Sequence, residues 1–469
     1  MLPSAAELVA RFLRTNGYTK TLGSFVEEAG LRPDIGNSSD SKVTIETILQ
    51  EKKTYDLSLS LEKVTANEND RGWTACAPAK ATVLDSLPNR SNILSVSVLD
   101  LSLPTACSIR QYIVVTTADR HLHLLDPTSS NCPLVRTYSN FQDSPSLDIV
   151  ALESSHLLVA SMSGKLTLLN LATGTTVDER QDHTKYVVKL AIWHRDNTFL
   201  VASAGWDAKI FLYRLDFSTG VLHLGEPIAA LSLQSIPETM LFIASPEDSA
   251  PILLVARRDS TFLHYYATPT QEQPAFTLLG KQNLAPHSNA WIAFTPADIQ
   301  ICPTDPHVAA IATSSTPHMK LIVAKLLLPP SRTPSTCTGA GIDQTEVVTQ
   351  ASQARAELLI ADREEAAILV NVSTLAPQTA YSTPRVVWRP DGSGVYVSSD
   401  DGIVRGLETK TGKLVASLDA HEPGSKLRCL WSGLLQTNKS DRESSDPADT
   451  GEYLISGGFD QRLVLWSST

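Results

Sequence analysis

The chain has 469 residues, enough for one large repeat domain and a small additional one. Its formal net charge of −11 argues against a surface that neutralises phosphates, and its six scattered cysteines, without a CxxC pair, fit reduced thiols rather than a zinc site. Neither a secretory signal nor an apolar run of the roughly 20 residues that span a bilayer is found, so we expect a cytoplasmic or nuclear protein without direct contact to nucleic acid or membrane.

Two short helices are predicted over residues 4 to 29. The segment Ser4-Ala5-Ala6-Glu7 is a capping box that starts the first helix, and Asn16-Gly17 stops it, because both residues tolerate a left-handed backbone. Apolar residues follow one face of each helix. Helices this short expose more apolar surface than they bury between themselves, so we expect a second copy of the chain to cover them.

The same segment resembles the LisH motif, which in its family forms dimers through a small four-helix bundle. The matching positions, at a fixed spacing, are Leu8, Phe12, Leu13, Gly17, Tyr18, Thr21, Phe25 and Glu28. The resemblance implies that residues 1–31 form a homodimer. Its contact is expected at Leu8, Phe12, Leu13, Tyr18, Leu22 and Phe25. The alternative is an amphipathic helical hairpin that docks on the rest of the chain.

Residues 32–80 are expected to connect this element to the remainder of the chain. A third helix is predicted to begin at Ser41 and to continue towards Val64, with too few regular heptads for a coiled coil. The polar segment Thr65–Lys80 is predicted to be a linker. Strands are predicted from Ala81 onward, so residues 81–469 are taken as one β-domain.

Seven two-stranded units follow one another in this β-domain. Most have two apolar strands joined by a short polar or glycine-containing turn, the pattern of a β-hairpin. Their starts lie roughly 40 to 60 residues apart, with one longer interval, and this is the spacing of four-stranded propeller blades. The units are Tyr112–Asp126, Leu157–Asn170, Phe199–Leu215, Ile252–Tyr266, Val308–Leu326, Val395–Glu408 and Glu452–Trp466.

Two of the units carry the same set of polar positions. These are His421, Ser456, Asp460 and Trp466 in the last unit, and His183, Ser203, Asp207 and Tyr213 in the third. The set resembles the WD40 repeat, whose blades hold a His–Ser–Asp–Trp chain of hydrogen bonds that satisfies buried polar groups. The resemblance implies an all-β fold, a seven-bladed WD40-type propeller with degenerate repeats, preceded by the α-helical LisH-like dimerisation element.

The last unit ends at its third strand, so a fourth strand must come from elsewhere. In WD40 propellers the first strand of the domain completes the last blade, and the resemblance gives this role to Ala81–Leu87. The blades are then expected to start at Ile93, Leu134, Thr176, Leu222, Phe276, Ile368 and Leu414. Two polar insertions, at about 329–353 and 436–451, are predicted to be mobile loops.

No catalytic motif is recognisable, so we expect a protein that is not an enzyme and needs no cofactor. The Ser–His–Asp sets have the composition of catalytic triads, but the resemblance places them inside blades as structural networks. His121 and His123 lie two apart on one strand face, a geometry that metals can use. A third ligand is not evident, so two ordinary strand histidines and no metal site are expected.

The most promising contact surface is a rim of turns around the channel. The resemblance implies that turns between second and third strands lie there. The candidate residues are Tyr186, Trp206, Arg257, Arg258 and Phe459. Tryptophan and arginine are enriched at interface hot spots, so these residues are predicted to bind an acidic or aromatic-bearing partner segment. The alternative is that Trp206 packs on its own blade while the arginines stay solvated.

Together these patterns predict a non-catalytic protein–protein interaction scaffold. The LisH-like helices pair two chains, and the pairing raises the effective concentration of a second rim contact. The alternative is a substrate-recognition subunit of a ubiquitin ligase or another multi-subunit enzyme complex. A ligase adaptor often shows Trp-Asp-x-Arg at a blade end, and Trp466-Ser467-Ser468-Thr469 departs from that pattern.

Overall fold

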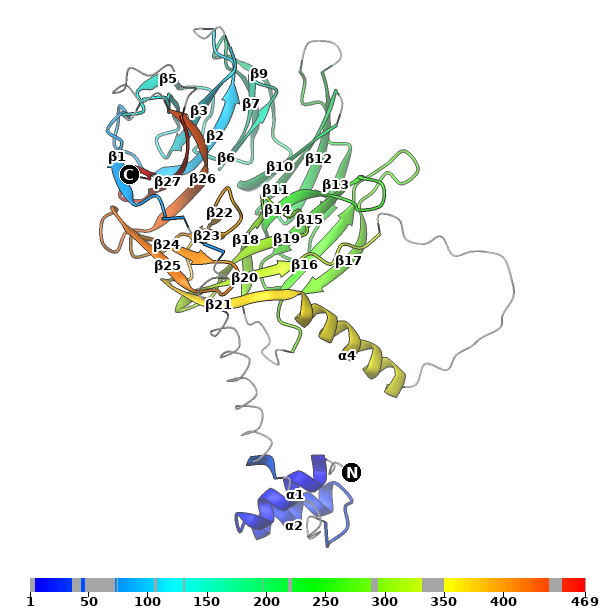
Figure 1. Cartoon of the computed structure of the whole chain (residues 1–469). Helices are drawn as coiled ribbons and strands as arrows, with labels where there is room; N and C mark the ends of the chain where they lie inside the picture. The colour runs from blue at the N-terminus through cyan, green and yellow to red at the C-terminus, as the bar shows by residue number, and fades with distance from the viewer. Residues whose placement is uncertain are drawn as a thin grey trace. The chain divides into compact units, whose positions relative to one another are not determined.

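The structure is a computed structural model of the chain. It describes residues 5–35, 44–46, 72–73, 75–104, 108–129, 131–195, 197–217, 222–287, 294–330, 350–437 and 449–468. The chain divides into two compact units, Met1–Arg71 and Gly72–Thr469 (Figure 1). No helix among the described residues is both long and apolar enough to cross a bilayer.

The described part of the first unit is a pair of helices. Helix α1 spans Ala5–Thr15 and α2 spans Thr19–Glu28. Between them Gly17 has a φ of 76°, and the Asn16 side-chain amide donates to the carbonyl of Phe12 over 3.0 Å, which ends α1 as predicted. The predicted helical pair is confirmed. Ser4 and most of the predicted third helix lie outside the described residues.

The second unit consists of seven four-stranded antiparallel sheets. Blades one to three contain β2 (Ile93–Leu101), β3 (Arg110–Thr117), β4 (Leu122–Leu125), β5 (Leu134–Tyr138); β6 (Ser146–Leu152), β7 (His156–Ser161), β8 (Leu166–Asn170), β9 (Thr176–Arg180); and β10 (Val187–Arg195), β11 (Thr198–Gly205), β12 (Lys209–Asp216), β13 (Ala229–Ser232). Blades four and five contain β14 (Pro237–Ala244), β15 (Pro251–Arg257), β16 (Phe262–Ala267), β17 (Thr277–Asn283); and β18 (Thr295–Ile301), β19 (Val308–Ser314), β20 (His318–Lys325), β21 (Ile368–Pro377). Blades six and seven contain β22 (Val386–Trp388), β23 (Gly394–Val397), β24 (Ile403–Glu408), β25 (Leu414–Asp419); and β26 (Leu427–Thr437), β27 (Asp449–Gly458), β28 (Leu463–Ser467), β1 (Lys80–Val83).

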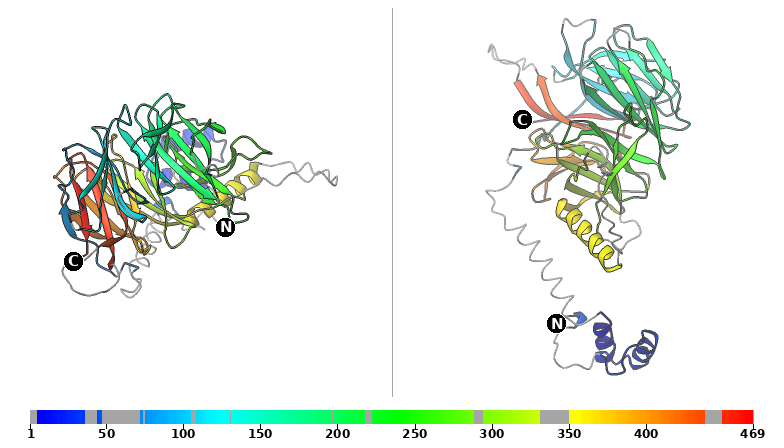
Figure 2. Two further views of the ribbon diagram at one scale, coloured as in Figure 1. Left: turned by 90° about the horizontal axis from the view of Figure 1, so that it is seen from above. Right: turned by 90° about the vertical axis from the view of Figure 1, so that its right-hand side faces the viewer.

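These sheets form a closed ring. Their first strands contact one another in the cycle β2, β6, β10, β14, β18, β22, β26 and back to β2. Figure 1 shows these strands around the centre of the ring, and Figure 2 gives two side views of the same sheets. Seven apolar clusters fill the spaces between neighbouring sheets, one for each pair. Because most sheets are covered on both faces, many inner strands read as continuous apolar runs. The seven-bladed β-propeller with N-terminal helices is therefore confirmed.

The ring is sealed by a strand from the start of the propeller. β1 pairs antiparallel with β28, with Ala81 opposite Trp466. The backbone N–H of Leu84 extends the contact by donating to the carbonyl of Leu463 over 2.8 Å. The expected closure by the segment beginning at Ala81 is confirmed, although the strand ends at Val83 rather than Leu87. Pairing removes the open edge that blade seven would otherwise expose.

The outer strands correct the expected blade starts. β5, β9, β17, β21 and β25 pair with β4, β8, β16, β20 and β24. The units expected to begin at Leu134, Thr176, Phe276, Ile368 and Leu414 therefore each give their first strand to the preceding sheet. The strand expected at Leu222 begins at Ala229 and likewise completes blade three. The reason is connectivity, since consecutive strands usually pair. The same offset leaves blade seven one strand short and creates the place that β1 fills.

The described ends of the two insertions contain regular secondary structure that was not predicted. Helix α4 spans Gln350–Ala367, lies on the outside of the ring, and contacts β17 and β21 (Figure 1). Its alanine- and glutamate-rich sequence favours a helix, and Glu364 accepts from the backbone N–H of Asn283 over 2.7 Å. In the second insertion β26 and β27 continue to the pair Thr437 and Asp449. Residues 331–349 and 438–448 lie outside the described residues.

The predicted linker contains an anchored residue. Trp73 is only 6% exposed, packs edge-on against Tyr396, and lies under the guanidinium of Arg389, 4.4 Å from the ring centroid. Gly394 and Gly406 make room, since a Cβ at either position would overlap the indole. Burial of a tryptophan stabilises a fold as a core residue does. The compact propeller unit therefore begins at Gly72, ahead of the expected start at Ala81.

Candidate functional site

Four side chains form a chain of hydrogen bonds beneath the turn of blade seven. His421 Nδ1 lies 2.8 Å from Asp460 Oδ2, His421 Nε2 lies 2.7 Å from Ser456 Oγ, and Trp466 Nε1 donates to Ser456 Oγ over 2.8 Å. Burial by itself would raise the pKa of Asp460, but the bonds from His421 and from the backbone N–H of Glu422 outweigh it and hold that pKa below its usual value. The structure thus brings the four predicted residues together.

Blade three repeats the first part of this chain and then departs from it. His183 Nδ1 lies 3.0 Å from Asp207 Oδ1, and His183 Nε2 lies 2.8 Å from Ser203 Oγ. Tyr213 occupies the position of the tryptophan, but its hydroxyl donates to Asp182 Oδ2 over 2.9 Å. Tyr213 thus lies where the sequence places it, near Ser203, but its hydroxyl donates to a residue of a neighbouring loop.

The serines of both networks are fully buried. Ser203 and Ser456 have no exposed surface, and each histidine ring is almost as deeply enclosed. A catalytic serine must contact its substrate. These buried hydroxyls are therefore badly placed to act as the nucleophiles of catalytic triads. The bonds instead tie the turn to the strands beneath it and satisfy buried polar groups.

Three of the predicted rim residues lie together at the turn of blade three. The rings of Tyr186 and Trp206 stack with centroids 5.3 Å apart, and the Arg258 guanidinium of blade four lies over the indole at 5.4 Å. Trp206 keeps 37% and Tyr186 39% of its surface exposed. We call these three residues the rim patch. It lies on two neighbouring blades, as predicted.

The backbone holds the rim patch in place. The N–H of Trp206 donates to the carbonyl of Tyr186 over 2.8 Å, so the two aromatic residues are joined at their main chains as well as at their rings. Arg258 Nε contacts Glu238 Oε1 at 2.5 Å, which fixes the guanidinium over the indole. The N–H of Arg258 donates to the carbonyl of Ile236 over 2.7 Å, as the N–H of Trp206 does to that of Tyr186. Arg258 therefore occupies the turn position in blade four that Trp206 holds in blade three.

The other two predicted rim residues lie apart from the patch. The Arg257 guanidinium is half-buried and reaches inward, with Nε 3.5 Å from His264 Nε2 and Nη1 3.3 Å from Ser235 Oγ. Burial, aided by the charge of Arg257, lowers the pKa of His264 to about 4, so this pair carries one positive charge at pH 7. Phe459 is 41% exposed in the turn of blade seven, and the part of the chain that the structure describes gives it no ring partner.

The predicted dimerisation residues lie on the two N-terminal helices with apolar surface still open. Tyr18 is 54% exposed. The half-buried members are Leu8, Phe12, Leu13, Leu22 and Phe25. Within residues 6–35 and 44–46 only Ala10 and Arg11 are buried. The helical pair therefore leaves apolar surface for another contact.

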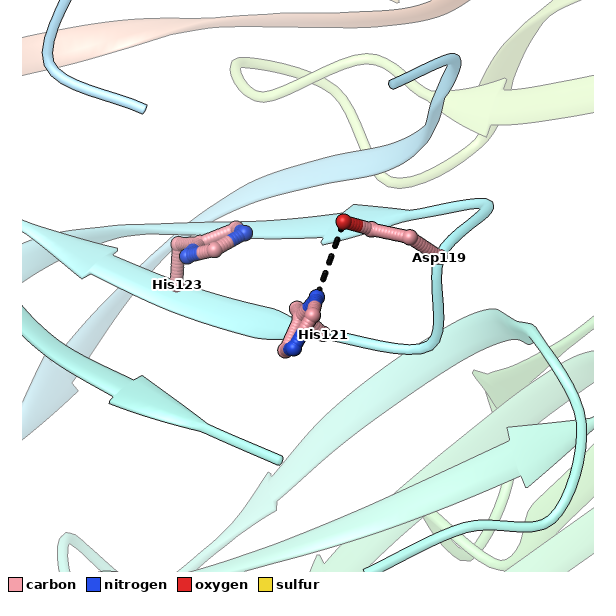
Figure 3. A group of neighbouring side chains, drawn as sticks. All are labelled: Asp119, His121 and His123. Carbon is pink, nitrogen blue, oxygen red and sulfur yellow. Dashed lines mark ion pairs between the residues drawn. The ribbon is translucent and has the colours of Figure 1, made fainter. Parts of the chain in front are cut away.

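A cluster that sequence reasoning missed lies at the turn of blade one. Asp119 Oδ2 is 2.9 Å from His121 Nδ1, and one candidate ligand atom from each of Asp119, His121 and His123 lies within 4.8 Å of the other two (Figure 3). The structure supplies the third residue that the histidine pair lacked in the sequence. The available signal was the Asp-x-His-x-His spacing, which places the carboxylate in the turn directly before the histidine strand.

Two family models match the chain. The LisH domain of UCP007778 matches residues 6–31, and the β-propeller domain of UCP007778 matches residues 106–422. Among curated proteins none matches this chain. The two matched segments coincide with the helical pair and with the ring from blade one to the loop before β26, and the propeller match alone covers more than half of the 469 residues. The chain therefore belongs to the UCP007778 family, which combines a LisH domain with a β-propeller domain.

Proposed function

We propose that this protein is a non-catalytic scaffold that pairs through its LisH domain and binds a partner protein at the rim patch. The observation that carries the proposal is the exposed Tyr186–Trp206 stack beneath the guanidinium of Arg258. Aromatic and arginine side chains dominate interface hot spots, and a rigid patch loses little conformational entropy on binding. Exposed apolar surface of this kind marks interaction sites.

The chemistry of the rim patch favours an acidic partner segment with an aromatic or aliphatic neighbour. A guanidinium over an indole face keeps its outer N–H groups available to a carboxylate, while the ring edges offer apolar contact. The carboxylate of Glu238 binds Nε of Arg258 and so orients the guanidinium. The half-buried charge of Arg257 adds positive potential next to it.

A capture experiment with full-length protein tests the rim patch. Trp206→Ala and Arg258→Ala are each expected to lose the proteins that co-purify with the wild type, as read by affinity mass spectrometry. Phe459→Ala is the matched control, because Phe459 holds the same turn position in blade seven at similar exposure. Unchanged partners in both rim variants, or equal loss in the Phe459 variant, would overturn the proposal.

Pairing of two chains is the second part of the proposal. The open apolar side chains of α1 and α2 and the matched LisH domain support it. Two propellers in one dimer raise the effective concentration of the second rim contact, so weak contacts give useful avidity. Light scattering on full-length protein is expected to give twice the chain mass for the wild type and for the control Lys20→Ser. The variants Phe12→Ser and Phe25→Ser are expected to give the chain mass. A monomeric wild type would contradict this part alone.

We also propose that the seven sheets are degenerate WD40 repeats. The hydrogen-bonded sets of blades three and seven support this, since each connects a turn aspartate, a histidine and a serine in the order typical of that repeat. Asp207→Asn and Asp460→Asn are expected to lower the unfolding midpoint, because each would break the charged bonds to a buried histidine. An unchanged midpoint in both would remove the support.

A further inference from the structure

The turn of blade one gathers the ligand atoms of a metal centre. Asp119 precedes the strand β4, His121 stands directly before it, and His123 lies within it. Figure 3 shows one ring nitrogen of His123 facing the Asp119–His121 pair. Imidazole nitrogens and a carboxylate oxygen are ligands that zinc prefers, and three protein ligands with an open position are typical of sites that also hold water.

The ring of His123 is held for such a role. Its Nδ1 lies 3.0 Å from the Thr137 hydroxyl on β5, whereas Nε2 has only a long 3.5 Å contact with Thr117 Oγ1. When Nδ1–H donates to Thr137, the lone pair remains on Nε2. Metal-binding histidines almost always have their second nitrogen fixed by such a bond. The ring is buried, so its orientation is set by packing as well.

The other two residues have polar atoms left unsatisfied. Asp119 Oδ1, which is buried, and His121 Nδ1 each lack a hydrogen bond of good geometry, although the side chains of Thr117, His121 and Asn89 lie near enough to stabilise the Asp119 carboxylate. The backbone around them is fixed, since Ser91 Oγ accepts from the N–H of Asp119 and Arg120 has a φ of 69°. A cation between the three side chains would satisfy both atoms at once. Both side chains are partly exposed, which leaves a path for the ion.

Blade one differs here from blades three and seven. In those blades the turn aspartate is bound by a histidine from the preceding loop and by a backbone N–H, from Thr184 in blade three and from Glu422 in blade seven. In blade one the histidine follows the turn aspartate and stands directly before β4, and the second histidine, within β4, lies beside it with ring centroids 5.7 Å apart. The same turn position is thus surrounded by ligands instead of a hydrogen-bond chain.

We propose that Asp119, His121 and His123 bind one divalent transition-metal cation, with zinc the best fit. The fourth coordination position points outward and takes a water molecule. Closing the present separations to bonding distance requires only side-chain rotation of the partly exposed pair, since His123 is already fixed. The site is independent of the rim patch, which lies on blades three and four.

Titration of the full-length, chelator-treated protein tests this site. Calorimetry with Zn²⁺ and the visible absorption of Co²⁺ in its place are expected to show one site per chain that His121→Ala and His123→Gln remove. Thr137→Val is expected to weaken the affinity about tenfold through loss of the supporting bond. The control is His223→Ala, because His223 lies 3.7 Å from Asp178 in a histidine–carboxylate pair without a second histidine.

The outcomes separate a metal site from a structural pair. Zn²⁺ should raise the unfolding temperature of the wild type and of the His223 variant, and not that of the His121 variant, whose partly exposed residue leaves folding intact. Circular dichroism checks that the buried His123 variant is folded. Absence of Zn²⁺ binding in the wild type, or equal stoichiometry and affinity in the wild type and the His121 variant, would overturn the proposal.

Discussion

Blades three and seven start from the same three side chains beneath the same turn and complete the set differently. In blade seven the serine is shared by His421 and Trp466, and the chain of bonds ends inside the sheet. In blade three the Tyr213 hydroxyl lies near Ser203 but donates to Asp182, which also binds Arg180. One blade closes its polar chain in the core, and the other extends it to a partly exposed ion pair.

The exposed aromatic residues in the turns above these two networks also differ in their contacts. Trp206 is stacked between Tyr186 and the guanidinium of the neighbouring blade, whereas Phe459 stands at a similar exposure without such support. A shared repeat can therefore carry a contact surface on one blade and an ordinary turn on another. What differs is the residue that the adjacent blade presents, and this is why the pair makes a matched test.

The largest expected difference between the blades comes from the serine hydroxyls. Ser456→Ala leaves both His421 and Trp466 with an unpaired buried nitrogen, at a cost of about 2–6 kcal/mol of unfolding free energy. Ser203→Ala leaves only His183 unpaired, at about 1–3 kcal/mol. Urea denaturation followed by circular dichroism compares the two variants. Equal losses would show that the two networks are equivalent.

A pH profile sharpens the comparison at the histidine of blade three. Burial, opposed by the bond from Asp207, lowers the pKa of His183. The unfolded chain therefore takes up a proton near pH 6.5 that the folded blade does not. Stability thus falls as the pH drops from there towards the folded pKa, by at most about 1.4 kcal/mol per pH unit. His183→Gln should give a flatter profile of unfolding midpoints. A slope equal to that of the wild type would contradict the prediction.

A double-mutant cycle tests the hydrogen bond from Tyr213 to Asp182 that ends the blade-three network. Tyr213→Phe is expected to cost about 1 kcal/mol, because one hydrogen bond to a partly exposed carboxylate is lost. Combined with Asp182→Ala it should add little, while combined with Ser203→Ala it should add fully. The opposite pattern in denaturation midpoints would mean that the hydroxyl serves the serine, as the indole does in blade seven.

The smallest effect is expected at the rim. A second cycle, with Trp206→Ala and Arg258→Ala, should give a coupling energy of about 0.5–1 kcal/mol in the unfolding of the free protein, the size of an exposed cation–π contact. Phe459→Ala with Arg462→Ala, two residues of the blade-seven turn for which the described residues show no cation–π contact, should give no coupling. Additive behaviour in the first cycle would show that the stack is loose in solution.

Features that depend on residues close together in the sequence could be predicted from it. The hairpins recur at one interval, and His421, Ser456, Asp460 and Trp466 lie at separations that local turns fix, so the ring and its best network could be predicted. The position of Tyr213 follows from the same spacing, but its partner does not, since Asp182 comes from a different loop.

What the sequence could not reveal depends on residues brought together from far apart. A lone tryptophan in a polar segment gives no sign of burial until Gly394 and Gly406 are known to stand beside it, as they do for Trp73. The guanidinium over Trp206 comes from the next blade. The carboxylate beside His121 was missed for a different reason: its turn had not been recognised as the equivalent of the aspartate turns in blades three and seven.

The seal between β1 and β28 sets the order in which the chain can finish folding. The strand β1 leaves the ribosome before every other strand that the structure describes in the ring, and it meets its partner only when Leu463–Ser467 emerges. Until then the ring carries two unpaired edges, the condition that invites association with other chains. Trp73 packs on blade six, next to the position that β1 must take. This contact keeps β1 close to its final position and so favours its pairing with β28. Loss of Leu463–Ser467 would leave that early strand without its partner.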